Sequence, residues 1–257
     1  MLKKTIMQIA PLFDLSGKKI LITGAAKGNG AALARGMSDA GAEVILVDVD
    51  DKGVQRLADT FRAEGRLASA YRLDVSQIEG CLQLAEEVGD IDVLINNAGL
   101  LKRIPFASAS VYEAFAVTLA VNVHGPFNMT RAFLPALKRR RGNIINIASI
   151  QSFVAAPTSP TYAISKGALA QLTRTLAAEL ATDNIRVNAI APGMIATEMS
   201  ASTRDNEEVM QRFLQHVPMK RAAQPDELIG PATFLASSAA SYVTGVILPV
   251  DGGYLVS

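Results

Sequence analysis

The sequence predicts an α/β fold in which helices cover both faces of one mostly parallel, doubly wound sheet. Short apolar runs alternate with amphipathic helical patterns almost to the end of the chain. These runs are rich in Val and Ile and apolar at both odd and even positions, as expected for strands that are covered on both faces. With 257 residues, 49% of them hydrophobic, the chain has enough apolar material for one large core. We therefore expect a single domain over residues 1–257.

Strands joined by helices imply right-handed crossovers and a sheet of seven strands. Residues 1–14 are expected to form an N-terminal extension, and residues from about 194 to 218 a substrate lid. The strands are expected at 18–23, 42–48, 67–74, 91–97, 143–149, 185–192 and 245–252. The helices are expected at 29–40, 51–64, 77–88, 109–138, 161–182 and 225–237.

Charge and cysteine content argue against several classes of function. Lys plus Arg number 25 and Asp plus Glu number 24, so no global basic field attracts nucleic acid or anionic lipid. Cys81 is the single cysteine, which excludes an internal disulfide and fits a reducing compartment. The N-terminal segment lacks the features of a secretory signal, and no apolar run approaches the ~20 residues of a membrane span. We expect a cytoplasmic protein with a small-molecule substrate and neither a nucleic-acid nor a membrane partner.

Two further features have structural interpretations. The basic run 138–141 stands where the helix expected at 109–138 should end. Its cations suit the negative end of the helix dipole, and Gly142 suits the position after the helix, so we prefer this to a nucleic-acid patch. His124 and His216 lie too far apart in sequence for a local zinc motif, and no metal site is expected.

Three glycines stand at the junction between the first expected strand and the first expected helix. Thr23 ends the strand, and Gly24, Gly28 and Gly30 follow in the turn. Glycines let the backbone approach a pyrophosphate closely, and a helix N-terminus offers it free N–H groups and positive potential. Because the glycines follow a strand and open a helix, they predict a dinucleotide-binding domain of the Rossmann type.

Asp48 ends the second expected strand, 24 residues after Gly24. Dinucleotide-binding domains place an acidic residue about 20 residues after their glycines, where its carboxylate binds the ribose hydroxyls and repels a 2′-phosphate. The neighbours Val47 and Val49 add no positive charge, although Lys27 in the glycine turn acts against this preference. The expected cofactor is therefore NAD rather than NADP.

The pattern T-G-x-x-x-G-x-G beginning at Thr23 resembles the fingerprint of the short-chain dehydrogenase/reductase family. Asn29 departs from that fingerprint, which usually has Ile or Leu there, and is expected to change the local packing under the cofactor. The segment Asn-Asn-Ala-Gly at 96–99 is a second match, and the resemblance extends from about Leu15 to Gly253. It implies a cofactor site made of Gly24, Lys27, Gly28, Asn29, Gly30, Asp48, Asp74, Val75, Asn97, Ala98, Gly99, Tyr162, Lys166, Pro192, Gly193, Ile195 and Thr197.

Tyr162 and Lys166 stand four residues apart in a strongly helical stretch, which places both on one face of the helix. A tyrosine with an unperturbed pKa of ~10 is a poor base at neutral pH. A nearby ammonium group favours the phenolate, so Lys166 is expected to lower the pKa of Tyr162. Lys166 is also placed to hold the nicotinamide ribose beside the tyrosine oxygen.

Two polar residues complete a resemblance to the catalytic tetrad of the family. Ser149 ends the fifth expected strand, at the edge where open α/β sheets bind ligands, and its hydroxyl can polarise a substrate carbonyl. Asn122 matches the asparagine that supports a proton relay in that family. The resemblance therefore implies that Tyr162 donates or accepts the proton, Ser149 and Tyr162 contact the substrate, and Lys166 tunes the tyrosine.

The segment after Asn-Asn-Ala-Gly carries two adjacent cations, Lys102 and Arg103. An arginine beside the substrate cleft can bind a carboxylate through two parallel hydrogen bonds. Here the chain resembles the subgroup of gluconate 5-dehydrogenases and 2-dehydro-3-deoxygluconate dehydrogenases. The implied function is an NAD-dependent interconversion of a secondary alcohol and a ketone, on a sugar acid or related polyol, with Arg103 binding the substrate.

Three alternatives remain open at this stage. A 3-oxoacyl-carrier-protein reductase is one, with the basic run as a docking patch, and a steroid or secondary-alcohol dehydrogenase with an apolar lid is another. A non-catalytic nucleotide-sensing protein on the same fold is a third, since fold alone does not fix function. The resemblance further implies a homotetramer, built through the helices at 109–138 and 161–182 and the C-terminal strand.

Overall fold

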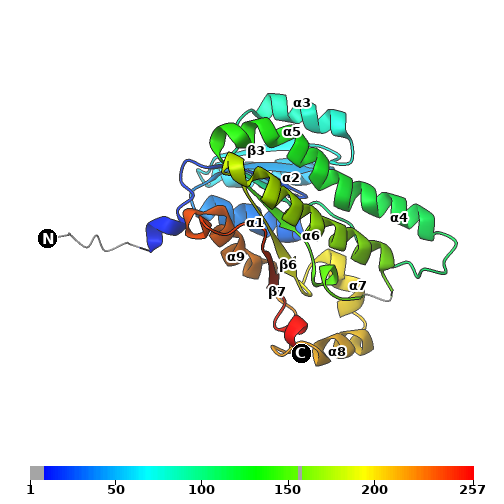
Figure 1. Ribbon diagram of the computed structural model, residues 1–257. Helices are drawn as coiled ribbons and strands as arrows, with labels where there is room; N and C mark the ends of the chain where they lie inside the picture. Colours follow the sequence, from blue (N-terminus) through cyan, green and yellow to red (C-terminus); the bar gives the residue numbers. More distant parts are fainter. Residues whose placement is uncertain (1–8, 156–157) are drawn as a thin grey trace.

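The computed structural model describes residues 9–155 and 158–257. One sheet of seven parallel strands runs through it in the order β3-β2-β1-β4-β5-β6-β7, which confirms the predicted fold class (Figure 1). The strands are β1 (Lys19–Thr23), β2 (Glu43–Asp48), β3 (Ala68–Arg72), β4 (Val93–Asn96), β5 (Asn143–Ile147), β6 (Arg186–Pro192) and β7 (Ile247–Val250).

Helices pack on both faces of the sheet, and each face has its own apolar core. One core takes its helical side chains from α1, α2 and α9, and the other takes them from α3, α5 and α6. The helices are α1 (Gly28–Asp39), α2 (Asp51–Ala63), α3 (Ile78–Val88), α4 (Val111–Leu119), α5 (Gly125–Arg140), α6 (Pro160–Leu180), α7 (Ala201–Arg204), α8 (Glu207–Gln215) and α9 (Ile229–Ala236).

The central strand β1 shows why its three middle residues are all apolar. Ile20 and Ile22 belong to the core under α1, whereas Leu21 between them belongs to the core under α5. All three side chains are fully buried. Alternate residues of a strand point to opposite faces, so a strand that is covered twice needs apolar residues at both parities.

The structure refines three boundaries that the sequence predicted. The helix expected at 109–138 consists of α4 and α5, joined by the π-helical segment Ala120–His124. Residues 1–8 of the expected N-terminal extension lie outside the described residues; residues 10–13 of it form a 3₁₀ turn. Part of the expected lid, which had no assigned secondary structure, forms the two short helices α7 and α8. Among the described residues, no helix is long and apolar enough to span a membrane.

The basic run ends α5 and is bound to the body of the protein, as the structural interpretation predicted. Lys138 pairs with Asp183 at 2.8 Å, and Arg139 pairs with Asp90 at 2.7 Å. Arg141 caps the helix in the left-handed conformation, and Gly142 follows it at the predicted position. Glycine is needed there because a Cβ atom would lie 2.5 Å from the carbonyl oxygen of Asp92.

Asp92 fastens the two central strands and the end of α5 to one another. Its carboxylate accepts hydrogen bonds from the Lys19 amide at 3.0 Å and from the Arg140 guanidinium at 3.0 and 3.2 Å, and it lies 3.3 Å from the Lys18 ammonium. Its side chain is only 5% exposed. A buried carboxylate with this many donors stabilises the fold because its removal leaves those donors without an acceptor.

Replacing Asp92 by Asn is therefore expected to lower the free energy of unfolding by about 1–3 kcal/mol. The measurement is urea denaturation followed by circular dichroism. The matched control is Asp90→Asn, because Asp90 pairs with Arg139 at the same end of the sheet but both side chains are about half exposed. That control is expected to cost less than about 0.5 kcal/mol. Equal losses in the two variants would contradict the role assigned to Asp92.

Candidate active site

A cleft of about 790 Å³ opens along the carboxyl ends of the strands. Open parallel sheets bind ligands at this edge, where neighbouring strands send their connections to opposite faces. Of the site residues predicted from the sequence, Asn122 alone is not part of the cleft wall. The others line it: Gly24, Lys27, Gly28, Asn29, Gly30, Asp48, Asp74, Val75, Asn97, Ala98, Gly99, Arg103, Ser149, Tyr162, Lys166, Pro192, Gly193, Ile195 and Thr197.

Thr23 and Asn97 fix the floor of the cleft between β1 and β4. The Thr23 hydroxyl oxygen accepts hydrogen bonds from the backbone N–H groups of Asn97 and Ala98, both at 3.0 Å. In return the Asn97 amide donates to the carbonyl oxygens of Thr23 at 2.9 Å and Gly24 at 3.0 Å. Two of these four bonds occupy the Asn97 side-chain amide donor, so its position in the cleft is set by the sheet.

The glycine turn fits the close approach of a phosphate-bearing ligand. Gly24 and Gly28 have φ of +65° and +56°, in the left-handed region that favours glycine. A Cβ atom on Gly30 would lie 2.0 Å from the Gly24 carbonyl oxygen, so only glycine fits there. Helix α1 begins at Gly28 without a side-chain hydrogen bond to its first turn, which leaves N–H groups for an anion.

Asn29, the departure from the family fingerprint, adds a polar atom to this turn. Its Oδ1 is buried and has no hydrogen-bond partner among the described residues. Such an atom costs free energy unless a bound ligand or water donates to it. The turn therefore fits a nucleotide cofactor in two respects, its shape and its unsatisfied polar groups.

Asp48 faces the cleft from the end of β2 and also holds the glycine turn. Its Oδ2 accepts a hydrogen bond from the Ala26 amide and its Oδ1 accepts one from the Asp50 amide, each at 3.0 Å. A carboxylate has about four lone-pair positions, so both oxygens keep acceptor capacity for a ligand. Lys27 nearby donates to Glu198, which belongs to the segment after β6, and so links the two sides of the cleft.

The carboxyl end of β5 and the first turns of α6 bring Ser149, Tyr162 and Lys166 together. Ser149 and Tyr162 line the same cleft, and the Ser149 hydroxyl lies close enough to the Tyr162 phenol to favour its charged form. The Lys166 ammonium donates to the Ile147 carbonyl oxygen at 2.6 Å and lies 5.6 Å from the centroid of the Tyr162 ring. Lys166 is only 4% exposed and Ser149 7%. The spacing of four residues does place both α6 side chains on one helix face, as predicted.

Burial dominates the protonation of both α6 residues. It raises the pKa of Tyr162 to about 12, opposed by the nearby Ser149 hydroxyl and by the charge of Arg103. It lowers the pKa of Lys166 to about 8. The expectation that Lys166 lowers the pKa of Tyr162 was therefore wrong for this structure. The reason is that desolvation penalises the phenolate, while the ammonium group is itself buried and directed to Ile147.

Asn122 stands behind the cleft wall, in the π-helical segment between α4 and α5. Its side chain exchanges two hydrogen bonds with the backbone of Leu100, both at 2.9 Å, and also donates to the Ser165 hydroxyl at 3.0 Å. A π-bulge inside an α-helix often marks a functional position, because the extra residue redirects side chains and backbone groups. In this structure Asn122 joins the segment after β4 to helix α6.

Comparison with known proteins decides the family of the chain. A family model described as enoyl-(acyl carrier protein) reductase matches residues 24–255. The 5-keto-D-gluconate 5-reductase of Escherichia coli (strain K12) is 39% identical over 251 residues, which cover 96% of this chain and 98% of that protein. The chain belongs to the short-chain dehydrogenase/reductase family.

Two further relatives of this dehydrogenase/reductase differ in the substrates that their names state. The galactitol 2-dehydrogenase (L-tagatose-forming) of Cereibacter sphaeroides is 40% identical over 256 residues, covering 97% of this chain and 100% of that protein. A crystal structure of a gluconate 5-dehydrogenase from Burkholderia cenocepacia J2315, in complex with NADP and tartrate, is 36% identical with a TM-score of 0.93. It covers 97% of this chain and 100% of that chain.

The substrate side of the dehydrogenase/reductase cleft carries one of the two predicted cations. Arg103 lines the cleft and donates to the Thr203 hydroxyl of α7, whereas its neighbour Lys102 is exposed and does not line it. Gln151, two residues after Ser149, also lines the cleft, and sequence reasoning did not single it out. Its Oε1 is buried without a partner among the described residues, so it is an available acceptor for a substrate hydroxyl.

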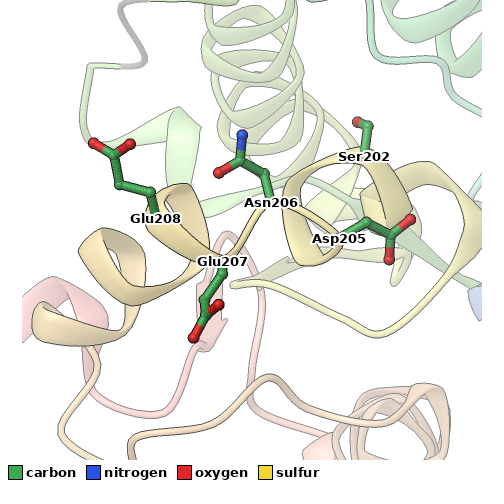
Figure 2. A pocket seen from close by; sticks show the side chains of 5 residues that line it. All are labelled: Ser202, Asp205, Asn206, Glu207 and Glu208. Atoms are coloured by element: carbon green, nitrogen blue, oxygen red, sulfur yellow. The ribbon is translucent and has the colours of Figure 1, made fainter.

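The two lid helices present a polar surface where they meet. Figure 2 shows five side chains around a hollow between α7 and α8. The carboxylates among them point in different directions, and the described residues contain no group of three or more His, Cys, Asp or Glu that could hold a metal ion. The five residues are Ser202, Asp205, Asn206, Glu207 and Glu208.

A substitution in the glycine turn tests whether this turn binds the cofactor. Gly30→Ala is expected to weaken NADH binding by about tenfold or more, because the added Cβ atom displaces the turn from the helix N-terminus. The measurement is a titration of NADH fluorescence. Gly230→Ala in α9 is the matched control, since a Cβ atom there meets nothing within 4 Å. Unchanged affinity in Gly30→Ala would contradict the assigned cofactor site.

Proposed function

We propose that this dehydrogenase/reductase interconverts a secondary alcohol and a ketone on a sugar acid, with NAD as cofactor. The observation that carries the proposal is that Ser149, Tyr162 and buried Lys166 line one cleft together with the glycine turn. A bound nicotinamide would supply hydride chemistry at the substrate carbon. The side chains of the protein supply binding, orientation and the proton.

In the direction of reduction, the Tyr162 phenol gives its proton to the carbonyl oxygen. In the direction of oxidation, the Tyr162 phenolate takes the proton of the substrate hydroxyl. A pKa raised to about 12 keeps the phenol protonated at neutral pH, which suits a proton donor. The Ser149 hydroxyl, which lines the same cleft, would hold the same substrate oxygen. Lys166 and Asn122 are positioned to orient the ribose and to support proton exchange with solvent, respectively.

The choice of NAD rests on Asp48. Its carboxylate keeps acceptor capacity toward the cleft and repels a 2′-phosphate. Lys27, the cation that acts against this preference, is paired with Glu198. The B. cenocepacia relative was crystallised with NADP, so direct comparison of the two cofactors is part of the test.

The choice of a sugar acid rests on Arg103. Its guanidinium lines the cleft, and its charge acts on the Tyr162 phenol. A substrate carboxylate in the cleft would therefore meet a cation. The relatives that act on ketogluconate and gluconate by name agree with this choice.

A neutral polyol is the second candidate substrate, since one relative at 40% identity is a galactitol 2-dehydrogenase. Gln151 offers its unpartnered Oε1 to a hydroxyl group and does not distinguish an acid from a polyol. The apolar side chains of Met194, Met199 and Phe213 in the cleft keep an apolar alcohol as a further candidate.

We also propose that the enzyme assembles as a homotetramer through the helices α4, α5 and α6 and the C-terminal strand β7. Tyr112 and Val117 on α4 are 83% and 42% exposed, and Ile164 on α6 is 52% exposed. Exposed apolar side chains on two helices that pack together suit an isologous contact with a second copy.

Gluconate is expected to be oxidised with NAD at a higher kcat/KM than galactitol. Arg103→Ala is expected to raise KM for gluconate about ten- to hundredfold, the cost of losing a charged hydrogen bond, and to leave KM for galactitol nearly unchanged. The measurement is absorbance of the reduced cofactor, with NAD and NADP in parallel.

Lys102→Ala is the matched control, because it removes the adjacent cation that does not line the cleft. An equal effect of Arg103→Ala on acid and polyol would remove the proposed carboxylate contact. A preference for galactitol in the unmodified enzyme would replace the sugar acid by a polyol, and a preference for NADP would overturn the argument from Asp48.

The raised pKa of Tyr162 predicts a pH dependence. For alcohol oxidation the phenol must first lose its proton, and the fraction that has done so rises as pH increases toward the pKa. With that pKa at about 12, kcat/KM for oxidation is expected to rise continuously through the neutral and mildly alkaline range. The measurement is kcat/KM at saturating NAD over a series of buffers. A profile that does not change with pH over this range would contradict Tyr162 as the base.

A further inference from the structure

Helix α8 lies at the cleft but has little anchoring of its own. None of its nine residues is buried, although Phe213 on it lines the cleft. The helix carries charged residues along its exposed side, with Arg212 paired to Glu208 at 2.7 Å. An amphipathic helix without buried residues needs support from another segment to keep one orientation.

The segment after β7, residues 251–257, supplies that support. The Tyr254 ring stacks on the Phe213 ring with centroids 5.0 Å apart and planes inclined by 20°. The same ring lies 6.1 Å from the ring of His216, at the end of α8. The Ser257 hydroxyl donates to the His216 carbonyl oxygen at 2.6 Å. In Figure 1 this segment, drawn in red, lies directly beside α8.

The backbone of residues 251–257 is itself held in place, so the Tyr254 side chain extends from a backbone with a defined position. The Asp251 carboxylate accepts hydrogen bonds from the Gly253 amide at 2.9 Å and the Leu255 amide at 3.0 Å. Gly253 has a φ of +89°, and a Cβ atom there would lie 2.9 Å from the Pro218 ring. Glycine is therefore required for this turn to pass over Pro218.

The base of the same segment adjoins the cofactor side of the cleft. The Gly193 amide donates to the Val250 carbonyl oxygen at 3.0 Å, and a Cβ atom on Gly193 would lie 2.9 Å from the Asp251 Cα atom. The segment therefore runs from the wall of the cleft at Gly193 to the back of the lid helix at Phe213.

We propose that Tyr254 is a positioning residue that holds α8, and through it the Phe213 side chain, over the cleft. Tyr254 itself does not line the cleft, so it acts through Phe213. The inference rests on the proposed function only in assuming that the cleft binds the substrate. A lid that is held in place keeps water out of the cleft. It also reduces the conformational change that is needed to reach the closed arrangement.

Limited trypsin digestion tests the lid directly, without a substrate. Tyr254→Ala is expected to speed cleavage after Arg204 and Arg212 by about three- to tenfold, the range that corresponds to the loss of one aromatic stack. Cleavage at sites outside residues 201–215 is expected to stay at the rate of the unmodified enzyme. Tyr254→Phe keeps the stack and is expected to restore slow cleavage. Mass spectrometry of the fragments gives the rate at each site.

Kinetics then separate positioning from stability. Tyr254→Ala is expected to raise KM for the substrate about three- to tenfold with a smaller change in kcat. Faster cleavage at every site, or a Tyr254→Phe variant that behaves like Tyr254→Ala, would overturn the proposal, as would an unchanged rate at Arg204 and Arg212. If no sugar acid is turned over while the cleavage pattern is as expected, the proposed substrate fails and the role of Tyr254 stands.

Discussion

The hydrogen bonds between Thr23 and Asn97 are the contact on which the rest of the cleft depends. They join β1 and β4 at the point where the strand order reverses, because the connection after β1 packs on one face and that after β4 on the other. A crevice opens at such a point in any doubly wound sheet. Here its floor is fixed by four hydrogen bonds, which also hold the glycine turn at the mouth of the crevice.

Burial then determines the chemistry of the cleft. Desolvation pushes the phenol of Tyr162 and the amine of Lys166 toward their neutral forms. The Ser149 hydroxyl and the positive charge of Arg103 act in the opposite direction on the phenol. Arg103 therefore has two roles. It is proposed to hold a substrate carboxylate, and its charge also favours the charged form of the Tyr162 phenol.

Local patterns revealed the parts of the site that lie within a few residues of each other. The glycine turn, the strand ends and the i, i+4 pair of α6 all follow from short-range geometry, and all were predicted from the sequence. Contacts between segments that are distant in the sequence were not predicted. Asn122 to Leu100, Gln151 to the cleft, and Tyr254 to Phe213 depend on how elements pack, for which one sequence gives no signal. The direction of the Tyr162 pKa shift was wrong for the same reason, because burial is a property of the packed molecule.

Tyr162→Phe tests the central claim most directly, because it removes one oxygen atom and leaves the ring in place. The measurement pairs turnover in the enzyme's best reaction with NADH affinity, determined by fluorescence in a chain that contains no Trp. Turnover is expected to fall by about 10²- to 10⁴-fold, the usual contribution of a positioned acid or base, while NADH affinity stays nearly unchanged. Turnover close to that of the unmodified enzyme would show that the Tyr162 phenol does not transfer the proton.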